Sequence, residues 1–191
     1  MSRLLLHACC APCATSVIER LRSDHELTLI FVNPNIQPAA EHRRRRIELE
    51  GYAVDQGLPL LEHADDLPAW SRDVVGLEDE PEGGARCTIC FRHRLAIVAR
   101  AAQEGGFDAI ATTLTVSPHK DAPRINRILT EEASRRGLTA VAGDWKKQDG
   151  FKLSCRLSRQ AGLYRQDYCG CIFSRRERDA RRKAPRPPRS A

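Results

Sequence analysis

The chain has 191 residues and a formal net charge of +6, and 41% of its residues are apolar. A chain of this length fits one domain that buries roughly two-thirds of its unfolded surface, so it needs no disulfides to fold. No stretch approaches the roughly 20 apolar residues of a membrane span. The N-terminal apolar run, Leu4–Leu6, is too short for a signal peptide. These features exclude membrane insertion and predict a cytoplasmic protein.

Short apolar runs alternate with segments of helical spacing along the chain. The strands are predicted at residues 3–8, 27–32, 58–62, 108–114 and 139–145, and the helices at 13–22, 41–53, 66–75, 88–103 and 122–136. This alternation predicts an α/β fold with an open, mainly parallel sheet and helices on both faces. Residues 1–174 are expected to form one catalytic domain with a helical, cysteine-bearing C-terminal segment.

The last seventeen residues, 175–191, carry the whole net charge, with eight Lys and Arg side chains against Glu177 and Asp179. A basic, Pro-rich segment of this kind is expected to be disordered. It is either a solvated tail or a contact for RNA phosphates. The run Arg43–Arg46 is ambiguous, because four consecutive helical residues point around the whole helix.

The chain contains eight cysteines that fall into groups. They are Cys9, Cys10 and Cys13; Cys87 and Cys90; a lone Cys155; and Cys169 and Cys171. In a chain without a secretory signal, such grouping indicates metal binding or redox chemistry rather than a disulfide framework.

The first group is expected at the carboxyl edge of the parallel sheet, where open α/β folds bind ligands. Residues 112–120 and 144–147 follow other strands and converge on the same edge. Cys87 and Cys90 begin a helix, whose N-terminus favours thiolates. Four thiolates from two such groups hold zinc or an iron–sulfur cluster, and the spacing does not choose between them.

Other interpretations of these cysteines stay open. One of the N-terminal three is alternatively a buried small side chain, which is the interpretation we favour for Cys155. The Cys169-Gly170-Cys171 sequence predicts a redox pair, because a disulfide in so small a ring is strained and easily reduced. Extra metal ligands and simple packing are the alternatives for this pair.

Three further side chains, Lys120, Arg165 and Tyr168, suit contacts to a phosphate and a base. Lys120 is equally well explained as a solvent-exposed lysine, and Tyr168 as a side chain that packs against the fold. The histidines His7, His63 and His93 are expected to be satisfied by local hydrogen bonds rather than to be catalytic.

Four ordered segments carry a resemblance to a known family. They are Leu4–Cys13, Glu80–Leu95, Thr112–Lys120 and Gly162–Ser174. The sequence resembles the QueH family of epoxyqueuosine reductases, which complete queuosine at the wobble position of the tRNA anticodon. It departs from the family at Cys155, where a serine is expected, and in the basic tail.

The resemblance implies a fold like that of the nucleotide alpha-hydrolase (HUP-like) group, without its glycine-rich ATP loop. It also implies a [4Fe–4S] cluster on four cysteines, which are Cys9, Cys10, Cys87 and Cys90. Cys13 would replace one of the adjacent pair or bind a second metal ion near the cluster. Cys169 and Cys171 would form the redox-active pair.

The reaction expected from the resemblance is two-electron removal of the epoxide oxygen of epoxyqueuosine, which leaves an alkene and water. Its partners would be tRNA carrying epoxyqueuosine and an external electron donor. Three alternatives remain: a zinc-stabilised RNA-binding domain without catalysis, an ATP-dependent tRNA-thiolating enzyme and a thiol–disulfide sensor. A colourless zinc protein would favour the first.

Overall fold

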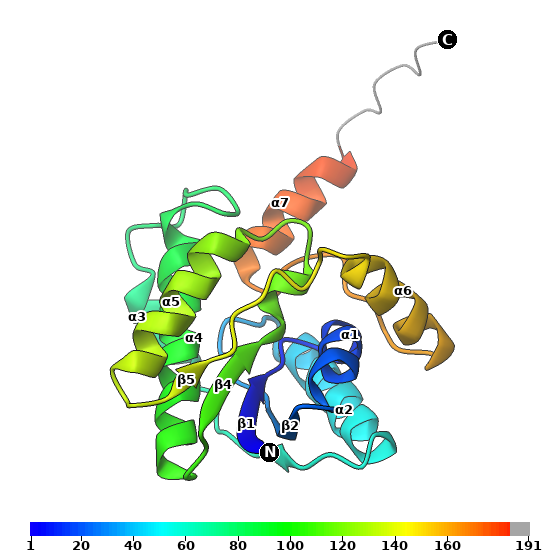
Figure 1. Cartoon of the computed structure of the whole chain (residues 1–191). Helices are drawn as coiled ribbons and strands as arrows, with labels where there is room; N and C mark the ends of the chain where they lie inside the picture. Colours follow the sequence, from blue (N-terminus) through cyan, green and yellow to red (C-terminus); the bar gives the residue numbers. More distant parts are fainter. Residues whose placement is uncertain (184–191) are drawn as a thin grey trace.

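The computed structural model describes residues 1–183 and contains a five-stranded parallel sheet between two layers of helices (Figure 1). The strands are β1 (Ser2–His7), β2 (His25–Ile30), β3 (Leu60–Leu61), β4 (Ala109–Thr112) and β5 (Thr139–Ala140). Their order is β3-β2-β1-β4-β5, and all neighbours pair in parallel. The predicted fold class is therefore confirmed.

The helices cover both faces of this sheet. They are α1 (Ala11–Leu21), α2 (Ala39–Asp55), α3 (Leu67–Asp73), α4 (Ala85–Glu104), the 3-10 helix η1 (Thr113–Val116), α5 (Ala122–Ser134), α6 (Gly150–Gln160) and α7 (Ile172–Lys183). The core of α1 and α2 includes Leu4 and Leu6 of β1, whereas Leu5 packs with α4 and α5. Successive strand residues point to opposite faces, so β1 is buried on both. No helix within residues 1–183 combines the length and apolar content that crossing a membrane requires.

The centre of the sheet contains a topological switch point between β1 and β4. The chain moves from β1 to β2 on one side, whereas β4 lies on the other side of β1. In such sheets, a crevice opens at the carboxyl ends of the two central strands. Here the segments that leave both strands meet, because the Cys9 N–H donates to Thr113 Oγ1 at 3.1 Å.

Three predicted strands are longer in the sequence analysis than in the structure, and one of them, β3, contains only Leu60 and Leu61. The strand expected to reach residue 114 ends at Thr112 and continues as η1, and the last strand ends at Ala140. The Thr115 hydroxyl donates to the Gly143 carbonyl at 2.7 Å, and the Lys146 N–H donates to the Thr115 carbonyl at 3.2 Å. The segment after β5 therefore bonds to η1 instead of extending the sheet.

The C-terminal region also differs from its prediction. Helix α7 extends to Lys183, so the expectation of a disordered tail is wrong for residues 175–183. Arg178 and Arg182 both form ion pairs with Asp167, which fastens the helix to the loop before it. Charge composition alone could not predict this helix, because Asp167, which pairs with its arginines, lies before the basic segment. Residues 184–191 lie outside the described part.

Candidate functional site

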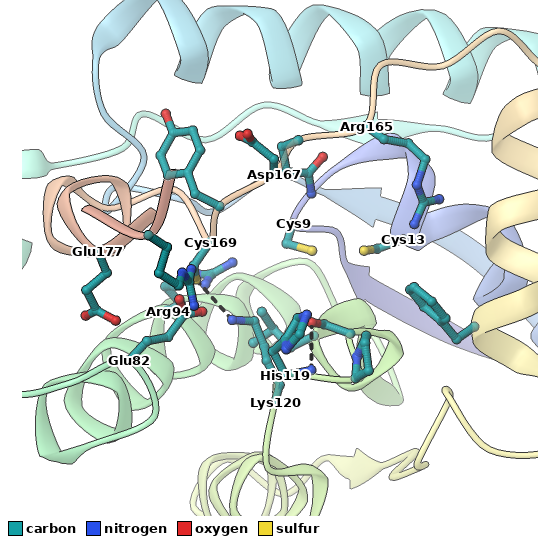
Figure 2. A pocket seen from close by; sticks show the side chains of 17 residues that line it. Cys9, Cys13, Glu82, Arg94, His119, Lys120, Arg165, Asp167, Cys169 and Glu177 are labelled. Carbon is teal, nitrogen blue, oxygen red and sulfur yellow. Dashed lines mark hydrogen bonds between the residues drawn. The ribbon is translucent and has the colours of Figure 1, made fainter. Parts of the chain in front are cut away.

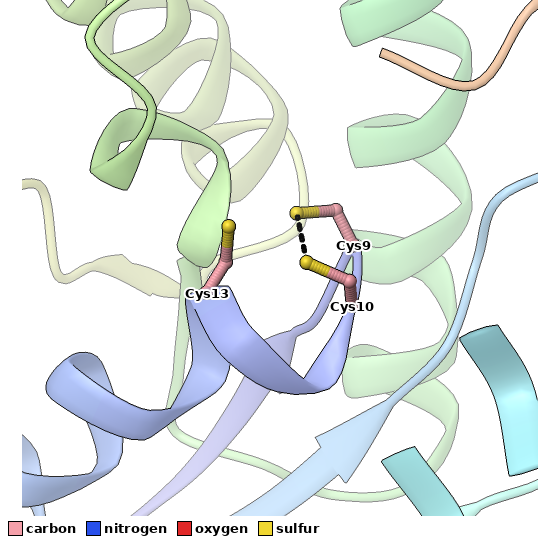
Figure 3. Close-up of side chains that lie close together, drawn as sticks. All are labelled: Cys9, Cys10 and Cys13. Atoms are coloured by element: carbon pink, nitrogen blue, oxygen red, sulfur yellow. Dashed lines mark hydrogen bonds between the residues drawn. The ribbon is translucent and has the colours of Figure 1, made fainter. Parts of the chain in front are cut away.

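Cys9, Cys10 and Cys13 lie together at the carboxyl end of β1 and the start of α1 (Figure 3). We call them the cysteine triad. Their sulfurs lie within 4.8 Å of one another, and the Cys9 and Cys10 Sγ atoms are 3.8 Å apart. Pro12 occupies the first turn of α1, where its missing N–H leaves no intrahelical bond unmade. The turn into α1 thus brings adjacent cysteines to one point.

Hydrogen bonds distribute the protons of the triad unevenly. The thiols of Cys10 and Cys13 lower the pKa of Cys9 well below its ordinary value, and the Thr113 hydroxyl also donates to Cys9 Sγ, at 3.5 Å. Bonding to Cys10 and Cys9, together with burial, raises the pKa of Cys13. The Gln166 amide donates to Cys10 Sγ at 2.9 Å. The triad therefore favours one thiolate, the form that binds metal.

Cys87 and Cys90 lie in the first turns of α4, and both are buried. Cys87 belongs to the apolar cluster against which Cys9 packs, whereas Cys90 packs with Cys171 and Trp70. Burial raises the pKa of Cys90 to about 11. Within residues 1–183, only the triad brings three possible metal donors within 4.8 Å of one another. The structure therefore does not bring Cys87 and Cys90 into that closely spaced group.

The predicted redox pair, Cys169 and Cys171, lies on the loop that leads into α7. Cys171 is buried and Cys169 is half-buried. Gly170 between them has a φ of +137°, and a Cβ there would lie 2.9 Å from Ile36 Cγ1. The guanidinium of Arg45 is buried and donates to the Cys169 carbonyl at 2.9 Å. This arginine and this glycine hold the backbone of the pair against the chain around α2.

A cavity of about 460 Å³ lies between the triad and the pair. Figure 2 shows Cys9 and Cys13 on one side of it and Cys169 with Lys120 on the other. Its volume lies in the range of roughly 300–1,000 Å³ that is usual for small-ligand sites. Both signs of charge line its wall: Glu82, Arg94, Lys120, Arg165, Asp167, Glu177 and Arg181.

The three predicted substrate contacts, Lys120, Arg165 and Tyr168, all line this cavity. The Lys120 ammonium donates to Cys169 Sγ at 3.0 Å, a contact that the sequence did not predict. Arg165 is exposed and donates to Ser158 Oγ at 2.7 Å. The Tyr168 hydroxyl donates to a backbone carbonyl at 2.6 Å. Their roles toward a substrate remain predictions.

Sequence reasoning missed Arg94, a cavity residue that is only 2% exposed. Its guanidinium donates to the Val32 carbonyl at 3.2 Å and to the Asn33 side chain. Within residues 1–183 no carboxylate oxygen lies within 4.0 Å of it. A buried cation needs a compensating charge, and the surrounding thiolates can supply one. Its regular position on α4 gave no local signal of this role.

The histidine expectation is confirmed for His7. This side chain is fully buried, its Nδ1 lies 2.8 Å from the Thr112 hydroxyl, and its Nε2 lies 3.0 Å from the Val32 carbonyl. Burial, together with the charge of Arg94, lowers the pKa of His7 to about 3. Through these two bonds His7 ties the end of β1 to the end of β4 and to the segment that follows β2.

The triad fits a thiolate-bound metal group. Soft sulfur ligands select zinc, copper(I) and iron–sulfur clusters. The 3.8 Å between Cys9 and Cys10 Sγ also suits two sulfurs on one tetrahedral ion. Two more buried thiols, Cys87 and Cys90, lie on the neighbouring helix α4 and are candidates for further ligands. The donor chemistry alone therefore supports a metal group without fixing its type.

Solved structures of other proteins share the fold of this chain. A predicted subunit of a tRNA methyltransferase from Methanocaldococcus jannaschii has a TM-score of 0.55 and 13% identity, and the match covers 83% of this chain and 75% of that one. The U34-tRNA thiolase NcsA from Methanococcus maripaludis, solved with its [4Fe-4S] cluster, has a TM-score of 0.56 and 14% identity. That match covers 91% of this chain and 61% of the thiolase chain. At these identities the likeness shows the fold alone, and it supports the predicted HUP-like α/β architecture.

Sequence comparisons then identify the family. The family model "Epoxyqueuosine reductase QueH" matches residues 4–177. Curated proteins of that name are 38% identical over 178 residues in Streptococcus pyogenes (90% of this chain, 69% of that one) and 33% identical over 181 residues in Thermotoga maritima (93% of both). The chain belongs to the epoxyqueuosine reductase QueH family, a family of oxidoreductases, and the resemblance seen in the sequence is confirmed.

Proposed function

We propose that this chain is an iron–sulfur epoxyqueuosine reductase that acts on the wobble nucleotide of a tRNA anticodon. The observation that carries the proposal is the family match over residues 4–177, which spans the triad, the α4 cysteines and the redox pair. It disfavours a zinc-stabilised RNA-binding domain without catalysis, because that alternative gives the redox pair no task. A tRNA substrate is the reason we place the reaction in the cytoplasm.

The proposed cofactor is a [4Fe–4S] cluster held by Cys9, Cys10, Cys87 and Cys90, with Cys13 as a further ligand or the ligand of a second metal ion. Cys9 packs against the group of buried apolar side chains that contains Cys87, and this contact supports the proposed ligand set. The lowered pKa of Cys9 also supports it. When bound, such a group supplies electrons and a Lewis acid for the epoxide oxygen. We propose that residues 1–174 form the catalytic domain, to which α7 is docked.

The side chains around the cavity suggest how a substrate is held. A cavity of about 460 Å³ admits one nucleoside, so we expect the modified base to leave the anticodon stack. Arg165 is exposed at the cavity and is our candidate for a phosphate contact. Tyr168 is our candidate for a contact to the base, although the guanidiniums of Arg45 and Arg178 already lie over its ring, 5.1 Å and 4.9 Å from its centre. Lys120 remains a candidate contact to the substrate, although its ammonium already bonds to Cys169.

The redox pair completes the electron balance. Reduction of the epoxide to an alkene and water consumes two electrons and two protons. Oxidation of the Cys169 and Cys171 thiols to a disulfide releases two electrons and two protons. An external reductant must then restore the thiols after each turnover.

Two measurements test this function. Anaerobically purified protein should be brown, carry about four irons and four sulfides per chain and convert epoxyqueuosine tRNA to queuosine tRNA. Replacing Cys169 and Cys171 together with serine should leave the iron content unchanged but abolish multiple turnovers. Full multiple-turnover activity in that double variant would end the relay proposal, and a colourless zinc protein without activity would end the reductase proposal.

A further inference from the structure

The two sulfurs of the redox pair have different surroundings. Cys169 lines the cavity and is half-buried (Figure 2). Cys171 is 7% exposed and packs with Trp70 and Cys90 outside the cavity lining. Its sulfur instead bonds to Ser174, whose N–H lies 3.4 Å away at the start of α7. A reagent that enters the cavity therefore meets Cys169 first.

Lys120 distinguishes the two sulfurs further. Its ammonium donates to Cys169 Sγ at 3.0 Å. Within the described residues, no carboxylate lies within 4.0 Å of this ammonium. The cavity also presents Glu82 and Arg94 near it. Burial would lower the pKa of Lys120, but the charge and hydrogen bond of Cys169 raise it above its ordinary value. Lys120 thus places a positive charge directly against Cys169 Sγ.

The backbone holds this contact in place from both sides. Lys146 Nζ donates to the Lys120 carbonyl at 3.2 Å. On the other side, Arg45 donates to the Cys169 carbonyl at 2.9 Å, and the Gly170 carbonyl accepts from the Gln37 N–H at 2.9 Å. The lysine and the sulfur are therefore fixed by separate parts of the fold rather than by their own bond alone.

We propose that Lys120 is a positioning residue that makes Cys169 the exchanging sulfur of the pair, while Cys171 is the buried partner, and that the external electron donor is a dithiol that reaches the pair through the cavity. The inference rests on the proposed function for the reaction that the pair serves. It adds the direction of exchange and the chemical class of the donor.

The exchange balances in two steps. A donor thiolate attacks Cys169, the Cys169–Cys171 bond breaks, and Cys171 leaves as a thiolate that takes up a proton. The second donor thiolate then attacks the donor sulfur of the mixed disulfide, and Cys169 leaves as a thiolate beside Lys120. The donor becomes a disulfide and the pair gains two electrons. The position of Cys169 at the cavity directs the first attack to it, and in the second step the ammonium of Lys120 stabilises Cys169 as the leaving thiolate.

The test compares how each sulfur is trapped in the full chain, reconstituted anaerobically with iron and sulfide. Single variants Cys171→Ser and Cys169→Ser are treated with 2,2′-dithiodipyridine, and adducts are assigned by peptide mass spectrometry over time. We expect a stable adduct on Cys169 in the first variant, formed at least about tenfold faster than the adduct on Cys171 in the second. Cys155 serves as the reference thiol in each sample.

The role of the lysine is tested in the Cys171→Ser background. Lys120→Met should slow the adduct on Cys169 about tenfold, and Lys120→Arg should restore most of the rate. The matched control is Lys147→Met, whose side chain is 76% exposed, and it should have no effect. A merely structural role would instead loosen the loop and quicken the reaction of Cys169, without rescue by arginine.

Equal trapping of the two sulfurs, or an unchanged rate in a folded Lys120→Met protein, would overturn the inference. The comparison of the two cysteine variants needs no change at Lys120, so it decides the assignment even where that variant fails to fold. No tRNA is used, so the outcome is separate from the proposed function. If the trap succeeds while the double serine variant still turns over, the relay fails but the assignment stands.

Discussion

The triad and the redox pair are both built from cysteines, yet the fold surrounds the two groups of sulfurs differently. The triad follows the central strand β1, and its sulfurs bond chiefly to one another, with 3.8 Å between the first two. The pair lies on a loop, and its sulfurs bond to other residue types, Lys120 for Cys169 and Ser174 for Cys171. Sulfurs that share protons suit a common metal ion, whereas sulfurs with separate partners suit stepwise exchange.

The largest effect that would separate the two regions is expected at Cys9. Cys9→Ser removes the thiol with the lowered pKa, so iron incorporation and reductase activity should fall below detection. Iron and sulfide analysis after anaerobic reconstitution measures this directly. Cys155→Ser on α6 is the control and should retain both. Full iron content in Cys9→Ser would show that the triad is not the metal site.

The next largest effect is expected on the free energy of unfolding when Arg45, the buried arginine that supports the pair, is replaced. Arg45→Met removes the bonds to the Cys169 and Tyr168 carbonyls and leaves Glu41 without the ion-pair partner that lies at 2.8 Å. Unfolding free energy should fall by about 3 kcal/mol, as for other broken buried ion pairs. Urea unfolding measures this loss. Arg46→Met is the control, since the exposed ion pair between Arg46 and Glu50 contributes about 0.5 kcal/mol or less. Equal losses would contradict the anchoring role.

A smaller effect is expected at the glycine of the pair. Gly170→Ala places a Cβ 2.9 Å from Ile36 Cγ1 at a φ of +137°, so stability should fall by about 2 kcal/mol. Gly162→Ala is the matched control, because its φ is +64° but no atom lies within 4 Å of the added carbon. It should lose only about 1 kcal/mol. Thermal unfolding of both proteins tests whether close packing, beyond backbone strain, fixes the pair.

The smallest effect is expected on tRNA binding at the cavity between the triad and the redox pair. Arg165→Gln should weaken tRNA binding a few-fold and lower the slope of log affinity against log salt by about one. Arg100→Gln, near the other end of α4, is the exposed control. Binding titrations at several salt concentrations measure both. An unchanged slope for Arg165→Gln would remove this arginine from the RNA contacts.

Much of the fold was predictable because its signals are local. Apolar runs located the strands, and the end of the first run placed Cys9, Cys10 and Cys13 at a strand end. The strand ends themselves were missed, since the bond from Thr115 to Gly143 that redirects the chain is a tertiary contact. No local pattern marks such a contact.

The site was harder to predict than the fold for the same reason. Lys120 and Cys169 are 49 positions apart, and Arg45 and Cys169 are 124 apart. Within the run of four arginines, only burial distinguishes Arg45 from its neighbours. Arg178 lies in a segment whose composition favours disorder, yet its ion pair with Asp167 helps hold α7 in place.

The attachment of the pair to α2 has a consequence for how such a protein can change. Arg45 bonds to the Cys169 carbonyl, Arg44 lies 3.4 Å from the ring centre of Tyr164, and the Tyr164 hydroxyl donates to Glu41. The segment 164–171 is therefore fastened to α2, and it also reaches the sheet edge, where the Gln166 amide donates to Cys10 Sγ at 2.9 Å. A shift of α2 is therefore expected to carry Cys169 and Cys171 with it and, through Gln166, to reach the triad.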